Sequence, residues 1–131
     1  MNHYQPISGE AERIGKAILD AAFKIHTSLG PGMLERVYEA CLEHELTKNG
    51  FSVRRQQGVP IIYDGIIFEE GFRLDLLIND LVIIETKAVE QYHPVWEAQL
   101  ISYLKLTGKR LGYLINFNVP LLKQGVKRIV V

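Results

Sequence analysis

Three side chains in two neighbouring apolar segments could do chemistry together. Asp75 lies inside the run FRLDLLI, where a carboxylate is costly to bury unless a partner binds it. Glu85 and Lys87 end the run LVIIETKAV and point to one face of a strand, because strand side chains alternate. Converging carboxylates can hold Mg²⁺ (or Mn²⁺), and a nearby ammonium can orient a water or neutralise a developing charge. The pattern therefore predicts a metal-assisted site.

This convergence depends on the register between the two strands. If residues 79–80 formed a simple two-residue turn, Asp75 would pair with Ile84 and point away from Glu85. A three-residue loop, or one bulge, moves Asp75 to the face of Glu85. We predict this odd register.

The same residues also allow a reading without a metal. Glu85 and Lys87 could form a solvated edge of their strand, while Asp75 pairs with Arg73 or with a backbone donor. The strand residues alone leave both readings open.

Helices must precede these strands. Ser8 can cap a helix over about residues 8–28, where apolar side chains recur every three or four positions. The sequence LGPG at 29–32 ends that helix, because proline and glycine break helical continuity. A second helix is expected from Met33 to about Lys48, closing at NG.

Beyond the second helix the apolar period changes to two. FSVRRQQ, VPIIYD, GFRLDLLI and LVIIETKAV are expected strands, with a turn at DG, residues 64–65. A third helix opens at 93–94 and lasts until 107–108, and LGYLINF and VKRIVV supply the last strands. A helix between two strands is a crossover and favours their parallel pairing. We therefore predict an α/β (α+β) fold, a central mixed sheet flanked by helices.

Composition limits the function classes. A chain of 131 residues is expected to form one domain over 1–131. Fifteen basic and fifteen acidic side chains cancel, so any nucleic-acid binding must come from local patches. The single cysteine, Cys41, excludes an internal disulfide, and the polar first residues do not resemble a signal peptide. With no apolar run near the roughly 20 residues that cross a bilayer, we expect a cytoplasmic protein without a membrane partner.

The acid and the acid-x-lysine pair on adjacent strands resemble the signature of the PD-(D/E)XK nuclease superfamily. The superfamily's order of helix, three antiparallel strands, helix and strand is similar to residues 33–117. GMLERVY, residues 32–38, resembles the motif of the GxxExxY family, small bacterial and archaeal (prokaryotic) proteins of that superfamily. AQLISY resembles the Q-x-x-x-Y element of RecB-like nucleases. The resemblance extends over about residues 10–131 and implies a PD-(D/E)XK restriction-endonuclease-like core.

The resemblance also implies roles for individual residues. Glu35 and the Thr86 carbonyl would complete the metal site of Asp75 and Glu85. Gln99 and Tyr103 lie one turn apart on a helix face and would help to orient Lys87 and the nucleic acid. Weaker candidates for nucleic-acid contact are Tyr38, Arg54, Arg55 and Lys105.

Several positions keep a structural alternative. Gln99 could be a surface residue and Tyr103 a core aromatic. His26 could be an upstream metal ligand, as in some RecB-like enzymes, or could pack against the LGPG corner. Trp96 stands where the family commonly has histidine, so that position is not expected to be an essential ligand. Arginines and lysines in short clusters could contact phosphates or simply be solvated.

The function that the resemblance implies is that of a Mg²⁺-dependent phosphodiesterase, a nuclease that cleaves DNA rather than RNA and leaves a 5′ phosphate. One alternative is a non-catalytic nucleic-acid- or protein-binding module that retains the nuclease fold. Another is a structural subunit of a larger complex. The small size of the chain favours a homodimer.

Overall fold

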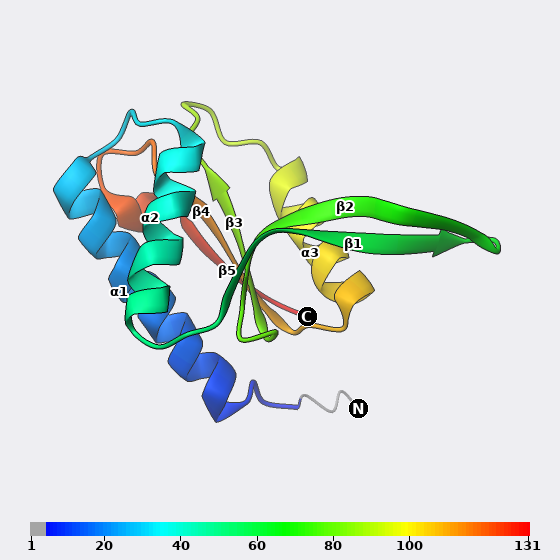
Figure 1. Ribbon diagram of the computed structural model, residues 1–131. Helices are drawn as coiled ribbons and strands as arrows, with labels where there is room; N and C mark the ends of the chain where they lie inside the picture. The colour runs from blue at the N-terminus through cyan, green and yellow to red at the C-terminus, as the bar shows by residue number, and fades with distance from the viewer. Residues whose placement is uncertain (1–4) are drawn as a thin grey trace.

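The computed structural model describes residues 5–131 (Figure 1). The chain forms three α-helices, five strands and a short 3₁₀ helix in that stretch. They are α1 (Gly9–Leu29), α2 (Glu35–Lys48), β1 (Val53–Tyr63), β2 (Ile66–Ile78), β3 (Val82–Lys87), α3 (Val95–Thr107), β4 (Leu111–Asn116), η1 (Leu122–Gln124) and β5 (Val126–Val130).

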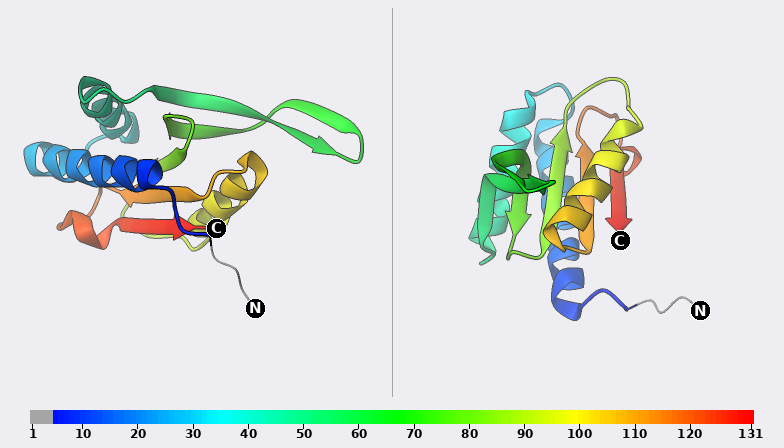
Figure 2. Two further views of the ribbon diagram at one scale, coloured as in Figure 1. Left: turned by 90° about the horizontal axis from the view of Figure 1, so that it is seen from below. Right: turned by 90° about the vertical axis from the view of Figure 1, so that its right-hand side faces the viewer.

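The strands form one mixed sheet in the order β1-β2-β3-β4-β5. β3 and β4 are parallel and are joined through α3, whereas the other neighbouring pairs are antiparallel. Helices α1 and α2 cover one face of the sheet and α3 covers the other (Figure 2). The predicted mixed sheet and its parallel crossover are therefore confirmed.

Two apolar layers hold these elements together, one on each face of the sheet. Ile14 and Ile18 of α1 pack with Leu42 of α2 and with the sheet face that carries Ile84. On the other face, the layer consists of Leu74, Leu77, Ile83, Leu100, Leu104 and Leu114. Because residues 83 and 84 enter opposite layers, β3 is buried on both sides, and a charged residue on it must find its own partners.

The helix boundaries follow local chemistry. Ser8 caps α1 by accepting a hydrogen bond from the N–H of Ala11 at 3.1 Å, as predicted. Gly30 ends α1 with a φ of 69°. Helix α2 begins at Glu35, two residues later than expected, because Leu34 stays extended after Gly32. No helix among residues 5–131 combines the length and the apolar composition that a bilayer crossing requires.

Two of the predicted strands are longer than the sequence pattern indicated. FSVRRQQ and VPIIYD belong to the single strand β1, and β2 begins at Ile66 rather than at Gly71. Pro60 does not interrupt β1, because the outer edge of that strand has no partner strand to require its missing N–H. Only Leu76–Ile78 of β2 pair with β3, so residues 57–74 continue as a two-stranded ribbon that packs on the body at its base and then extends away from it (Figures 1 and 2). We call residues 57–74 the arm.

Candidate functional site

The register between β2 and β3 is the odd one that the sequence predicted. Ile78 pairs with Val82, so three residues, 79–81, make the loop. Asn79 and Asp80 adopt left-handed backbone conformations, with φ of 50° and 57°, which asparagine and aspartate tolerate better than most residues. Continuing the register inward by three residues places Asp75 opposite Glu85.

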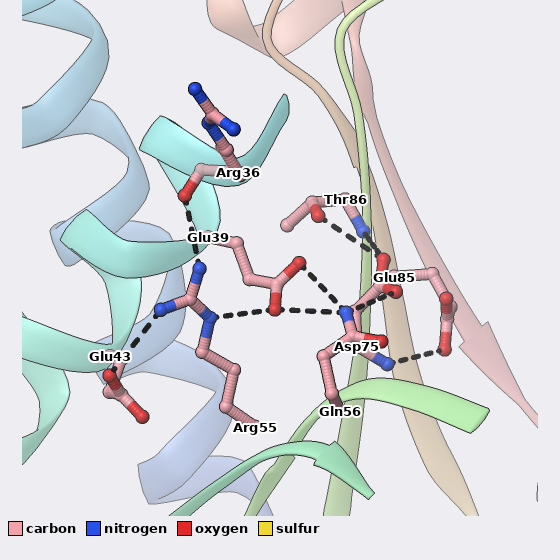
Figure 3. A network of polar contacts seen from close by, with 8 residues as sticks. All are labelled: Arg36, Glu39, Glu43, Arg55, Gln56, Asp75, Glu85 and Thr86. Atoms are coloured by element: carbon pink, nitrogen blue, oxygen red, sulfur yellow. Dashed lines mark hydrogen bonds and ion pairs between the residues drawn. The ribbon is translucent and has the colours of Figure 1, made fainter. Parts of the chain in front are cut away.

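Asp75 lies where β2 separates from β3. Its Oδ2 accepts hydrogen bonds from the backbone N–H of Thr86 at 2.9 Å and from the Thr86 hydroxyl at 3.2 Å. The backbone N–H of Asp75 in turn donates to Glu85 Oε1 at 3.3 Å. The side chains of Asp75 and Glu85 thus bind the other strand's backbone at the point where the ladder stops, and both carboxylates lie at this opening (Figure 3).

This arrangement bears on the reading without a metal. Asp75 does find a backbone donor, but not Arg73, which pairs with Glu70 instead. Glu85 is not part of a solvated edge, because only 6% of its surface is exposed. The two acids therefore meet in a partly enclosed site.

Burial changes the acidity of these carboxyl groups. Burial, and secondarily the charge of Asp75, raises the pKa of Glu85 to about 9. Glu35 on α2 is reached by solvent, yet partial desolvation and then the Asp75 carboxylate raise its pKa as well, while Lys87 opposes the increase. Glu35, Asp75, Glu85 and Lys87 are thus close enough to act on one another electrostatically.

A buried acid on α2, Glu39, is linked to Asp75 through the side chain of Gln56. Glu39 is 4% exposed and accepts hydrogen bonds from Arg55 Nε at 2.8 Å and from the Gln56 amide at 3.0 and 3.1 Å. The same Gln56 amide donates to Asp75 Oδ1 at 3.4 Å. Gln56 has a φ of 54°, and the register of β1 places it opposite Asp75. Figure 3 shows this chain of contacts from α2 through β1 to β2.

Neither Glu39 nor Gln56 was among the residues expected from the sequence. Glu39 lies four residues after Glu35, a spacing that puts both on one helix face, and this signal could have found it. Gln56 left no such signal, because its link to Asp75 depends on a long-range register and on an unusual backbone conformation.

Lys87 does not form an ion pair in the described part of the chain. Its Nζ lies 5.4 Å from the centre of the Trp96 ring on α3, a cation–π contact. An aromatic ring of α3 therefore lies beside the lysine. Trp96 is therefore a further residue of the site. The sequence analysis did not expect a metal ligand at this position and did not predict its contact with Lys87.

Helix α3 places Tyr103 beside the two acids. The Tyr103 ring stacks on Phe72 of the arm, with centroids 4.4 Å apart. Burial, and then the charges of Glu85 and Asp75, raises the pKa of Tyr103, so its hydroxyl lies within their field. Gln99 is exposed one turn earlier on α3, and its predicted role remains a prediction.

The predicted contact of Tyr38 with nucleic acid is wrong. Tyr38 has 0% of its surface exposed, and its ring stacks on Phe117 at 4.4 Å. Its hydroxyl donates to the Gly30 carbonyl at 2.6 Å and accepts from the Met33 N–H at 3.1 Å. The tyrosine of GMLERVY therefore fixes the corner between α1 and α2, which sets where α2 and Glu35 begin.

The remaining candidates differ in their freedom to bind phosphate. Arg55 is engaged by Glu39 and also contacts the Arg36 carbonyl at 3.3 Å, so α2 occupies much of its guanidinium. Arg54 and Lys105 are exposed and remain predicted contacts. His26 contacts the Val119 carbonyl at 2.9 Å through its ring, which favours packing at the corner over metal binding.

The donor set fits a hard divalent cation. A shallow depression between α2 and the base of the arm is lined by Leu34, Glu35, Arg36, Glu39, Gln56 and Asp75. Mg²⁺ and Mn²⁺ prefer oxygen ligands. The raised pKa of the buried Glu85 carboxyl indicates that no nearby positive charge fully compensates its ionised form. No group of three or more His, Cys, Asp or Glu side chains within residues 5–131 is already arranged around one ion. A cation would therefore be bound by a few side chains together with backbone oxygen and water, as Mg²⁺ commonly is.

Comparison with known proteins identifies a similar family. The family model described as the PD-(D/E)XK nuclease superfamily matches residues 12–129 of the chain. The match includes β1 to β4 and most of β5. It also includes the site residues Asp75, Glu85 and Lys87. No curated protein and no solved structure matches the chain.

Proposed function

Because the chain belongs to the PD-(D/E)XK nuclease superfamily, we propose that it is a metal-dependent nuclease that hydrolyses phosphodiester bonds in DNA, with Mg²⁺ or Mn²⁺ as cofactor. The observation that carries the proposal is the meeting of Asp75 and Glu85 where β2 and β3 separate, with Lys87 two residues further along β3. A fold alone does not determine function, so the argument depends on this site.

Each residue has a distinct task in the proposed reaction. Asp75 and Glu85 would bind the cation in their ionised forms, supported by Glu35 and the Thr86 carbonyl. The bound cation would supply an acidified water and would neutralise charge on the phosphate. Lys87 would hold the attacking water and offset the negative charge that builds up on the phosphoryl oxygens.

The reaction then proceeds by direct displacement. The water oxygen forms a bond to phosphorus while the bond from phosphorus to the 3′ oxygen breaks. The water loses its proton to solvent, and the 3′ oxygen leaves as a hydroxyl after taking up a proton. The products carry a 5′ phosphate and a 3′ hydroxyl, and no covalent intermediate with the protein forms.

The aromatic and amide side chains of α3 have supporting roles in this proposal. Tyr103 lies in the field of both acids, and Gln99 is exposed one turn away, where a nucleic-acid strand could reach it. Trp96 would limit the positions of the Lys87 ammonium by its cation–π contact. Arg54 and Lys105 would bind phosphates outside the cleavage site, in a salt-dependent manner.

A cleavage assay with matched variants tests the proposal. Purified protein would be incubated with plasmid, linear, branched and single-stranded DNA, and with RNA, in Mg²⁺ or Mn²⁺. We expect Asp75→Asn and Lys87→Met to lower the cleavage rate by about 100-fold or more. Asp20→Asn and Lys16→Met change the same residue types on the exposed surface of α1 and should retain full activity.

Binding measurements separate this proposal from the non-catalytic alternative. Calorimetric titration of the wild type with Mn²⁺ should show binding that Asp75→Ala abolishes. A wild type that binds no divalent cation and cleaves no substrate would instead identify a binding module that retains the fold. Activity that emerges only with an added partner protein would identify a subunit of a larger complex.

A further inference from the structure

Along most of its length, the arm is not paired with a third strand of the sheet. β3 pairs with only three residues of β2, Leu76–Ile78, so residues 57–74 are a ribbon of two strands. An isolated two-stranded ribbon is marginally stable in water. The arm contacts the body at its base, where Phe72 stacks on Tyr103, and then projects away from it (Figures 1 and 2).

The outer part of the arm, residues 61–68, exposes apolar side chains on both faces. The cross-strand pairs Ile61–Phe68 and Tyr63–Ile66 share one face, and the pair Ile62–Ile67 lies on the other, because pairs alternate along a ribbon. The exposed fractions are 71% for Ile62 and Tyr63, 64% for Ile67, 54% for Ile66 and 49% for Phe68. An antiparallel ribbon that faces water normally has one polar face, so this segment is suited to being enclosed by a partner.

The charge of the arm argues against nucleic acid as that partner. The arm carries three carboxylates, Asp64, Glu69 and Glu70, against the single guanidinium of Arg73, a net charge of −2. Phosphate binding requires the opposite sign. A protein surface is therefore the expected occupant.

The edges of the arm favour contact through its faces. Pro60 lacks an N–H on β1, and the register shifts between Val59 and Ile61, so that residues 69–71 of β2 bulge opposite Pro60. Proline and bulges discourage addition of a strand along an edge. The arm is therefore expected to associate through a face rather than by adding a strand to an edge.

We propose that residues 61–68 of the arm pack against the same segment of a second copy of this chain, giving a two-fold symmetric dimer. The same apolar side chains are present on both copies, as a two-fold interface requires. If the two-fold axis is perpendicular to the arms, they run antiparallel, and the acidic tip at Asp64 approaches the base of the other arm, near Arg54 and Arg73. The proposal goes beyond the nuclease function and does not rest on it.

The exposed area is consistent with a dimer of modest affinity. On one face of the arm, the exposed side chains of Tyr63, Ile66 and Phe68 contribute roughly 300 Å² per chain, because Ile62 and Ile67 point to the opposite face. Two copies packed through this face would remove on the order of 600 Å² from water, the size of a weak, reversible interface. A dissociation constant on the order of micromolar is expected.

Sedimentation equilibrium over about 1 to 200 μM protein tests the proposal, a range that brackets a micromolar constant. The wild type should pass from one chain mass to two, and Tyr63→Thr with Phe68→Thr should stay at one chain mass. The matched control is Phe23→Thr with Leu121→Thr, which removes two exposed apolar side chains from the body and should still dimerise. A wild type that remains a monomer, or a control that loses the dimer as fully as the arm variant, would overturn the proposal.

Hydrogen exchange distinguishes loss of the dimer from loss of folding. Amides of residues 61–68 should exchange several-fold more slowly at high than at low wild-type concentration, while those of the core strand β4 should not depend on concentration. In the Tyr63→Thr, Phe68→Thr variant the β4 amides should remain protected, and the arm amides should lose their concentration dependence. Arm amides whose exchange is independent of concentration in the wild type would contradict the proposal.

Discussion

Glu85 is a carboxylate that is costly to ionise in the metal-free protein. Its pKa is raised from 4.5 to about 9, so between these values the folded chain binds a proton that the unfolded chain has lost. The free energy of unfolding of the metal-free protein should therefore decrease as pH rises through this range, by at most ~1.4 kcal/mol per pH unit from this group.

Chemical denaturation in EDTA at pH 5, 7 and 9 would measure this slope. Glu85→Gln should flatten it, because glutamine cannot titrate. Glu90→Gln, a change of the same type at an exposed position after β3, should keep the wild-type slope. Equal slopes for Glu85→Gln and the wild type would show that Glu85 is not held as a protonated acid.

Gln56 connects Glu39 to Asp75 and has a left-handed backbone conformation. Gln56→Asn keeps a residue that tolerates this conformation but shortens the amide, so it should no longer reach both carboxylates. We expect the affinity for Mn²⁺ to fall about 10-fold, with little change in stability. Calorimetry would measure the Mn²⁺ affinity of this variant and of the control Gln57→Asn. The Gln57 amide donates to the Gly58 carbonyl and not to an acid of the site, so the control should bind Mn²⁺ normally. Unchanged Mn²⁺ affinity in Gln56→Asn would exclude a positioning role.

Tyr38 shows how a motif residue can be structural. Tyr38→Phe removes the hydroxyl that joins the Gly30 carbonyl to the Met33 N–H and leaves both groups without this partner. We expect a loss of about 1–3 kcal/mol in the free energy of unfolding, measured by denaturant titration. DNA affinity at a temperature where the variant is folded should not change, because the ring is buried. Tyr92→Phe, at a 44% exposed position, serves as the control and should cost little.

At the scale of the elements, the loop between β2 and β3 determines whether the site exists. Its three residues set the register that brings Asp75 to Glu85, and two of them hold positive φ angles. Asp80→Gly removes the steric cost of the left-handed conformation and should raise stability by up to ~1 kcal/mol, even though the ion pair of the exposed Asp80 carboxylate with Lys109 is lost. Thermal unfolding would measure the gain, and metal affinity should be unchanged because the register is kept.

Asn79→Gly separates backbone conformation from side-chain contacts in the same loop. The Asn79 side chain accepts a hydrogen bond from the Ser52 N–H at 2.7 Å, which glycine cannot replace. We therefore expect Asn79→Gly to be no more stable than the wild type, in contrast to Asp80→Gly. A gain of similar size in both variants would mean that the Asn79 contact contributes nothing.

The sequence predicted those features that depend on neighbouring residues. Alternation on β3 placed Glu85 and Lys87 together, and the need to satisfy Asp75 pointed to the odd register. The arm was missed because the predicted strands broke at Gly58 and began again only at Gly71, although glycine is tolerated on an unpaired edge and in a bulge. Glu39 and Gln56 were missed because their contacts join residues from three elements, which no local pattern reports.

At the scale of the whole molecule the charges cancel, whereas carboxyl groups are concentrated around the site. Glu35, Glu39 and Asp75 line one depression, and buried Glu85 accepts a hydrogen bond from the Asp75 backbone beside it, with Lys87 and Arg55 as nearby cations. The surface ion pairs, such as Arg128–Glu12 and Arg13–Glu10, are exposed and contribute little to stability. A divalent cation is therefore the ligand to which the stability of the folded chain should respond most.

This response should have a characteristic dependence on pH. Mn²⁺ at about 100 times its dissociation constant should stabilise the wild type by ~2.7 kcal/mol, measured as a rise in the midpoint of thermal unfolding. The apparent affinity should increase with pH up to about 9, because binding requires Glu85 in its ionised form while the metal-free protein holds it protonated. Stability should thus fall with pH in EDTA and fall less, or rise, in saturating Mn²⁺. Asp75→Asn should lose the response to Mn²⁺, and Asp20→Asn should keep it. A wild type whose two pH profiles run parallel would show that the acidic opening does not bind the cation through Glu85.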